Sequence, residues 1–177
     1  MIITITGPPG SGKSTVAKLL AEKLNMKYYS VGTFRREIAE KRGISLEALN
    51  RQDERTGETD HLADEWQKKL GKTEDNFVIE GRLPAFFIPN STKIFLEVSP
   101  KVGAERVFKY RQGSAVEAYE SIEDAMKKLK DRDMSDRKRY RQLYGINYDT
   151  LYFNLIIDTT NETPEGILHK ILEFLKK

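Results

Sequence analysis

The segment GPPGSGKST at residues 7–15 constrains the fold of this chain more than any other part of the sequence. It has the pattern G-x-x-x-x-G-K-[ST], in which a glycine-rich loop turns its backbone N–H groups towards phosphate oxygens. A β-branched run, Met1–Thr6, precedes the loop and predicts a buried strand, while Lys13–Leu24 has the apolar periodicity of a helix. Because strand, loop and helix occur in the order that the motif requires, we predict a phosphate-binding loop within an α/β domain.

The rest of the chain alternates strands with helices. Further strands are predicted at Lys27–Ser30, Asn76–Glu80, Lys93–Val98 and Phe153–Asp158. Helices are predicted at Thr33–Arg42, Ser45–Arg55, Glu58–Leu70, Pro100–Arg111, Ser121–Tyr144 and Thr163–Lys176. The strands are nearly continuously apolar, which indicates burial on both faces and predicts a three-layer α/β sandwich around a parallel sheet. Residues 1–177 are expected to form one domain, with residues 32–71 as a helical insert.

The loop residues have distinct expected roles in binding phosphates. The backbone of the whole loop and the positive end of the following helix should face the phosphate oxygens. Lys13 should reach the β- and γ-phosphates, and the Ser14 hydroxyl should contact Mg²⁺. The predicted nucleotide-binding residues are Gly7, Pro8, Pro9, Gly10, Ser11, Gly12, Lys13, Ser14 and Thr15.

A carboxylate that assists the metal is expected at the end of a neighbouring strand. Glu80 follows the apolar run FVI, and Asp158 at the end of LIID competes for the same role. Glu80 is the preferred candidate, and its longer side chain favours contact with Mg²⁺ through a water molecule.

The charged segment KDRDMSDRKRYRQ, residues 130–142, lies on the long predicted helix. A helical wheel places six residues on one stripe with apolar ends, which should face the body of the protein: Ala125, Leu129, Arg132, Asp136, Arg139 and Leu143. Ionised groups in such positions need partners or a ligand. The spacing allows either an internal ion-pair network or a ligand site. Arg137, Lys138 and Arg141 fall off the stripe and should be solvated.

Two other arginines favour the ligand site. Arg82 lies just beyond Glu80, at the carboxyl end of a predicted strand, where ligands bind in open α/β sheets. Arg36 lies in the first helix of the insert, four residues after Gly32. Several fixed arginines suit transfer between two phosphate groups, because donor and acceptor repel each other and the guanidinium fork binds phosphate bidentately.

The chain resembles the nucleoside monophosphate kinases, and most closely the cytidylate kinases of the archaeal type. The segments that carry the resemblance, in chain order, are GPPGSGKST, SVGTFRREIA, VIEGRLPAFFIP, KIFLEVSPKVGAERV, RDMSDRKRY, YGIN and LIIDTT. The phosphate loop belongs to a whole superfamily, whereas EGRL and the pattern R-D-x-x-D-x-x-R at Arg132–Arg139 are more specific. The resemblance implies a P-loop NTPase fold with strand order 2-3-1-4-5.

The resemblance also implies a role for each site residue. The loop would hold ATP, with Mg²⁺ as cofactor. Arg36 would hold the acceptor phosphate, Arg82 would contact cytidine monophosphate (CMP), and Asp136 would orient the acceptor or the arginines. Arg132 and Arg139 would bridge the reacting phosphates, so that Lys13, Arg82, Arg132 and Arg139 are the expected catalytic residues and Arg36, Arg82, Arg132 and Asp136 the expected monophosphate-binding residues.

The insert would be the monophosphate-binding subdomain, and residues 112–119 a short lid. The family has an arginine pair before the lid, and in the segment ERVFKYRQG three residues compete for that position: Arg106, Lys109 and Arg111. The expected reaction is transfer of the γ-phosphoryl group of ATP to CMP, with dCMP as a plausible second acceptor. AMP or UMP is the nearest alternative acceptor, and a P-loop ATPase or switch acting on RNA or a protein partner is the alternative from another class.

Composition excludes several other functions. The chain has no cysteine and two histidines, so a thiolate nucleophile, a zinc–thiolate site and a site of several imidazoles are not expected. A net charge of +3 is too small to indicate nucleic-acid binding, and no apolar run reaches membrane-spanning length. We therefore expect a cytoplasmic monomer whose partners are small-molecule nucleotides, with no nucleic acid or membrane partner.

Overall fold

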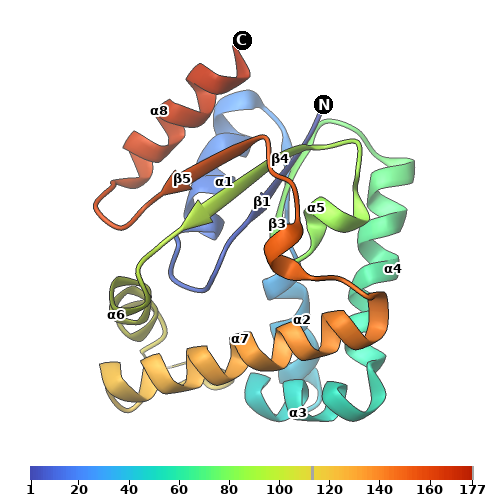
Figure 1. Cartoon of the computed structure of the whole chain (residues 1–177), viewed down its shortest axis with the longest axis vertical. Coiled ribbons are helices and arrows are strands. Elements are labelled where there is room, and N and C mark those ends of the chain that lie inside the picture. The colour runs from blue at the N-terminus through green and yellow to red at the C-terminus, as the bar shows by residue number, and fades with distance from the viewer. Residues whose placement is uncertain (113, 177) are drawn as a thin grey trace.

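The computed structural model describes residues 1–112 and 114–176 and has alternating strands and helices (Figure 1). The strands are β1 (Ile2–Thr6), β2 (Lys27–Ser30), β3 (Phe77–Gly81), β4 (Thr92–Glu97) and β5 (Leu155–Asp158). The helices are α1 (Lys13–Leu24), α2 (Val31–Lys41), α3 (Leu46–Thr56), α4 (Glu58–Thr73), α5 (Pro84–Phe87), α6 (Pro100–Tyr110), α7 (Ile122–Tyr144) and α8 (Pro164–Leu175), with a 3-10 turn at Tyr148–Thr150.

The five strands form one parallel sheet in the order β2-β3-β1-β4-β5, which confirms the predicted fold class and strand order. β1 lies at the centre and pairs with β3 through Ile5 and Glu80 and with β4 through Ile5 and Ile94. This register places the carboxyl end of β1, where the phosphate loop begins, beside Glu80 and Gly81.

Apolar packing covers both faces of the sheet. On one face, α1 and α8 pack on the central strands in a core that includes Ile3, Leu20, Ile94 and Ile171, all fully buried. On the other face, α4 joins β3 in a second core, and the residues after β3 join the end of α7 in a third. Burial of this apolar surface is the main force that holds the three layers together.

The helices of the insert and α7 position the site. Figure 1 shows α7 and α3 beyond the carboxyl ends of the strands, at the end of the sheet where the phosphate loop also lies. The helices α2, α3 and α4 lie where the sequence predicted three helices between the second and third strands. Ser30, Ser45 and Ser121 cap α2, α3 and α7, because each hydroxyl accepts a hydrogen bond from the backbone N–H three residues later.

One end of the predicted stripe on α7 is wrong. Ala125, Asp136 and Arg139 are buried as expected, but Leu143 is 47% exposed. Tyr140 is buried instead, because it packs in the apolar cluster with Ile146 beyond the helix end. Near the carboxyl end of α7, the buried face of the helix therefore includes Tyr140 and leaves out Leu143.

Candidate active site

The phosphate loop takes the conformation that its glycines permit. Gly10 and Gly12 have φ angles of 78° and 82°, in the left-handed region that favours glycine. A Cβ atom on Gly10 would lie 2.1 Å from the carbonyl oxygen of Gly103, so the loop packs directly on α6. Arg106 braces this contact by donating to the carbonyl oxygens of Gly10 at 3.3 Å and Thr159 at 2.8 Å.

Lys13, Ser14 and Glu80 meet where the loop joins α1. Lys13 donates from Nζ to the carbonyl oxygen of Pro8 at 3.1 Å. Ser14 donates from Oγ to Glu80 Oε1 at 3.0 Å, and the Ser30 hydroxyl donates to the same carboxylate oxygen. Glu80 is 1% exposed, so its charge is held inside the protein by hydroxyl donors.

A hydroxyl beside a buried carboxylate fits Mg²⁺, which commonly binds through one or two protein groups together with substrate phosphates and water. Asp158, the competing candidate, is exposed, and its Oδ1 accepts from the backbone and hydroxyl of Thr160. Glu80 is therefore the carboxylate that the structure brings to Ser14. Across residues 1–112 and 114–176, no three histidine or acidic side chains are grouped in a way that could hold a metal ion by themselves.

The electrostatics of Lys13 show that other cations surround it. Burial lowers the pKa of Lys13, Glu80 raises it, and Arg82, Arg132 and Arg36 lower it further, to about 8. Three arginines from three separate segments of the chain therefore act on the loop lysine. Their positive charges disfavour the ammonium form of Lys13 unless negative charge lies nearby.

Arg36, Arg111 and Arg132 converge on Glu117; these four residues are called the Glu117 cluster below. Glu117 Oε1 lies 3.1 Å from Arg132 Nη1, and its Oε2 lies 3.4 Å from Arg111 Nε and 3.5 Å from Arg36 Nη1. Sequence reasoning missed Glu117, because it lies in a short polar segment without periodicity.

The three residues that compete for the cation position before the lid have different surroundings in the structure. Arg111 joins the Glu117 cluster, Arg106 braces the phosphate loop, and Lys109 is exposed. Within the predicted lid, residues 112–119, Gly113 lies outside the described residues. Residues 114–120, which carry Glu117 to its three arginines, are called the lid segment below.

Arg82 links the site to α7. Its Nε lies 3.1 Å from Asp136 Oδ2, and its Nη1 lies 3.2 Å from Asp133 Oδ1. Its Nη2 is buried without a hydrogen-bond partner among the described residues. Burial lowers the pKa of Arg82, but Asp136, Tyr148, Tyr140 and Asp133 together raise it by more, so the guanidinium stays charged. Arg82 thus keeps a free donor beside an acidic partner that fixes its position.

Arg139 is buried on the inward face of α7, where it meets several hydrogen-bond acceptors. It is 2% exposed, and it donates to Asp60 at 2.6 Å, to Asp136 at 2.5 Å and to Ser135 at 2.6 Å. Asp60 also accepts from Arg35, a buried arginine that sequence reasoning did not select. Carboxylates enclose the guanidinium here, and the expected contact of Arg139 with the reacting phosphates stays a prediction.

Arg132 and Arg139, the two arginines of the predicted stripe, form ion pairs in different surroundings. Arg139 belongs to a buried ion-pair network, whereas Arg132 faces Glu117 on the side of the loop lysine. Asp136 serves both groups, because it contacts Arg139 and Arg82.

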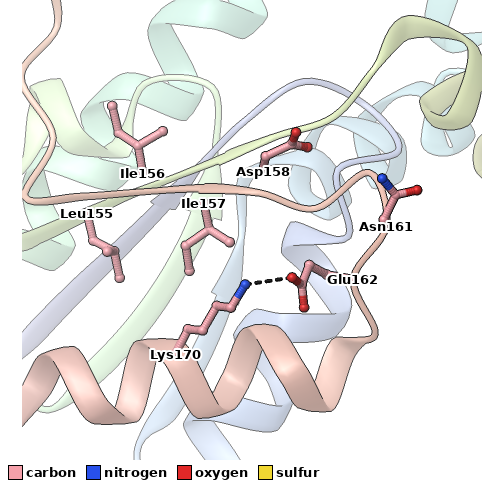
Figure 2. Close-up of a pocket in the computed structure, with 7 residues that line it drawn as sticks. All are labelled: Leu155, Ile156, Ile157, Asp158, Asn161, Glu162 and Lys170. Carbon is pink, nitrogen blue, oxygen red and sulfur yellow. Dashed lines mark hydrogen bonds and ion pairs between the residues drawn. The ribbon is translucent and has the colours of Figure 1, made fainter.

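A surface pocket lies between β5 and α8, outside the site just described. Figure 2 shows the ion pair of Lys170 with Glu162 across this pocket, with Ile157 and Leu155 on the strand beside it. It contains none of the predicted catalytic or phosphate-binding residues. In the described part of the chain, no helix is long and apolar enough to cross a membrane.

A phosphate loop that faces several arginines at the carboxyl edge of a parallel sheet defines the class of P-loop kinases. Solved structures share the fold: a shikimate kinase from Aquifex aeolicus has a TM-score of 0.60 at 23% identity, covering 99% of this chain and 96% of that chain. An uncharacterized protein from Eubacterium ventriosum has a TM-score of 0.69 at 20% identity, covering 100% of this chain and 99% of that chain.

Sequence comparison identifies the family. The model of the cytidylate kinase-like family matches residues 2–161. A cytidylate kinase from Archaeoglobus fulgidus is 36% identical over 98% of this chain and 93% of its own length. Another, from Pyrococcus abyssi, is 40% identical over 94% of this chain and 89% of its own length. The chain belongs to the cytidylate kinase-like family.

Proposed function

We propose that the protein is a cytidylate kinase, which transfers the γ-phosphoryl group of ATP to CMP and releases CDP and ADP. The observation that supports this most strongly is the group of arginines near the phosphate loop, where Arg36 and Arg132 meet at Glu117 and the charges of Arg36, Arg82 and Arg132 lower the pKa of Lys13. Family membership supports the identity of the acceptor, because the relatives that match nearly the whole chain are cytidylate kinases.

The arginines would supply the positive charge that this reaction requires. Donor and acceptor are both phosphate anions, so they repel each other unless fixed cations lie between them. Arg36 and Arg82 would hold the acceptor phosphate, Lys13 would contact the donor phosphates, and Arg132 would bridge the donor and acceptor phosphates. Arg82 Nη2 and Arg132 Nε are buried without hydrogen-bond partners among the described residues, so donors remain for a ligand.

The reaction needs little proton chemistry. An oxygen of the acceptor phosphate attacks the γ-phosphorus in line, and the bond from that phosphorus to the oxygen of the β-phosphate breaks as the new bond forms. The attacking oxygen is already ionised at neutral pH, so no strong general base is required. Catalysis then depends on alignment of the two phosphates and on stabilisation of the charge shared among their oxygens.

ATP would lie on the loop Gly7–Thr15. Ser14, and Glu80 through water, would hold Mg²⁺, which when bound neutralises charge on the donor phosphates. Asp136 would position Arg82, and Arg139 would act on Arg82 through Asp136. All of these residues belong to one chain, so the proposal requires no second subunit and is consistent with a monomer.

The acceptor is tested by incubating the protein with ATP and Mg²⁺ and with CMP, dCMP, UMP, AMP or GMP in turn, while ADP formation is measured. CMP should give the highest kcat/KM. A preference for AMP or UMP would change the assignment of the acceptor, and a rate that no monophosphate stimulates would exclude a monophosphate kinase.

Two variants on α7 test the role of the arginines. Arg132→Ala should lower kcat by about 10²–10³, the usual effect of losing one transition-state donor. Arg141→Ala, which removes an exposed arginine from the same helix, is the matched control and should leave the rate within about twofold. Equal effects of the two variants would contradict the role given to Arg132.

A further inference from the structure

Glu117 meets its three arginines inside the site, where an acceptor phosphate would need them. The cations come from α2, from the end of α6 and from α7, and they lie 3.1–3.5 Å from the two oxygens of this carboxylate. The side chain of Glu117 is only 8% exposed. Groups from three separate segments of the chain thus enclose one anion supplied by the lid segment.

A carboxylate is the protein group closest to phosphate in charge and in its oxygen acceptors. It is nevertheless a poorer partner for this cluster, because it has two oxygens whereas a phosphate monoester has three terminal oxygens and up to two charges. Arg132 Nε lacks a hydrogen-bond partner among the described residues even with Glu117 in place, and Glu117 Oε2 lacks one too, although Arg36 and Arg111 lie within 3.5 Å of it. The carboxylate therefore leaves donors of the cluster without a well-aligned acceptor, which favours exchange for a phosphate.

We propose that the Glu117 carboxylate occupies the position of the acceptor phosphate and competes with it, so that binding of CMP displaces Glu117 from Arg36, Arg111 and Arg132. Glu117 thereby sets the affinity for the acceptor and keeps the three cations paired until the acceptor arrives. This inference rests on the proposed function, since Arg36 and Arg132 belong to both the Glu117 cluster and the proposed acceptor site.

The environment of Glu117 keeps it charged and in place. Burial raises its pKa, but Arg132, Arg111 and Arg36 together lower it by more, so the pKa lies below its ordinary value. The Tyr119 hydroxyl donates to Glu117 Oε1 at 2.9 Å and holds the carboxylate towards the arginines. Glu117 is therefore an anion at neutral pH, as a competitor of phosphate must be.

The test is Glu117→Gln, which keeps the size of the side chain and removes its charge. Without the competing anion, the KM for CMP and the calorimetric Kd for CMP should both fall by about tenfold, as expected when a site that is about 90% blocked becomes free. The Kd for inorganic phosphate should fall in parallel, and kcat should stay within about twofold. The matched control, Glu120→Gln, removes an exposed carboxylate from the same lid segment and should change none of these values.

If Glu117 only orders the arginines, removing its charge should leave CMP binding unchanged or weaker. An unchanged or raised KM for CMP in Glu117→Gln would therefore overturn the inference. Tyr119→Phe gives a second, milder variant: it removes one hydrogen bond that holds the competitor and should lower the same KM by a smaller factor. A wild-type protein that does not phosphorylate CMP would refute the proposed function instead, so the two failures are distinguishable.

Discussion

Replacing Asp60 by asparagine should destabilise the protein strongly, although Asp60 is absent from the predicted catalytic residues. Asp60 is 4% exposed and accepts hydrogen bonds from two buried arginines, Arg35 and Arg139, the latter at 2.6 Å. It joins α4 to α2 and α7. Asparagine keeps the shape of the side chain but leaves these guanidinium groups with one carboxylate fewer.

The size of the effect follows from the charges enclosed around Asp60. The network contains three arginines and three aspartates with low exposure: Arg35, Arg82, Arg139, Asp53, Asp60 and Asp136. Its net charge is zero, so Asp60→Asn leaves one uncompensated positive charge. Breaking a buried pair in this way costs about 3–5 kcal/mol. For a chain of this length, about 2–4 °C per kcal/mol converts that cost to a fall in Tm of roughly 6–20 °C.

Urea unfolding followed by the fluorescence of Trp66, together with calorimetric melting, measures this change. The matched control is Glu58→Gln on the same helix, where Glu58 forms an exposed ion pair with Arg42 at 3.0 Å. That pair should contribute about 1 kcal/mol or less. A loss of stability in Asp60→Asn no larger than in Glu58→Gln would refute the view that Arg139 is held as a buried charge.

Three further predictions concern charge and space near the site. Because the pKa of Lys13 is about 8 and a triphosphate favours the ammonium form, ATP binding should take up protons near pH 8 in calorimetry, and affinity should fall above that pH. In Gly32→Ala, the new Cβ would lie 3.2 Å from Arg36 Nη2, so the KM for CMP should rise roughly tenfold with little change in Tm. Burial, followed by the charge of Asp60, raises the pKa of Asp64 to about 7. This carboxyl therefore stabilises the fold at low pH and loses that effect as the pH rises towards 7, so Asp64→Asn should stabilise the protein more at pH 8 than at pH 4 in thermal melting.

Each of these three has a result that would contradict it. Proton uptake that persists unchanged in Lys13→Met would show that another group titrates on ATP binding. A KM for CMP that Gly32→Ala does not alter would remove Arg36 from the acceptor site. Equal stabilisation by Asp64→Asn at both pH values would mean that Asp64 does not titrate in this range.

The parts of the site that were predictable from sequence are those fixed by local patterns. The phosphate loop needs only a short glycine-rich segment between a strand and a helix, and α1 begins and ends where its periodicity indicated. The inward position of Asp136 followed from helical spacing on α7. By contrast, α5 has four residues, Pro84–Phe87, which is too short for any apolar period to be recognised.

The roles of individual charges depended on contacts that no local pattern contains. Arg139 could be assigned to an ion-pair network only when its partner Asp60, 79 residues earlier in the chain, was located. The Glu117 cluster joins segments from α2, α6, the lid segment and α7. Helical spacing could show that a charged side chain faces inward. Tertiary packing decides whether that side chain pairs with a carboxylate or faces a phosphate-binding site.

The most direct measurement of the central claim follows the transferred phosphoryl group itself. The protein is incubated with Mg²⁺, CMP and ATP labelled at the γ-phosphate, and the products are separated by chromatography. The label should appear in CDP, in equal amount to the ADP formed, and little inorganic phosphate should be released. Label that appears as inorganic phosphate at the same rate with and without CMP would contradict it.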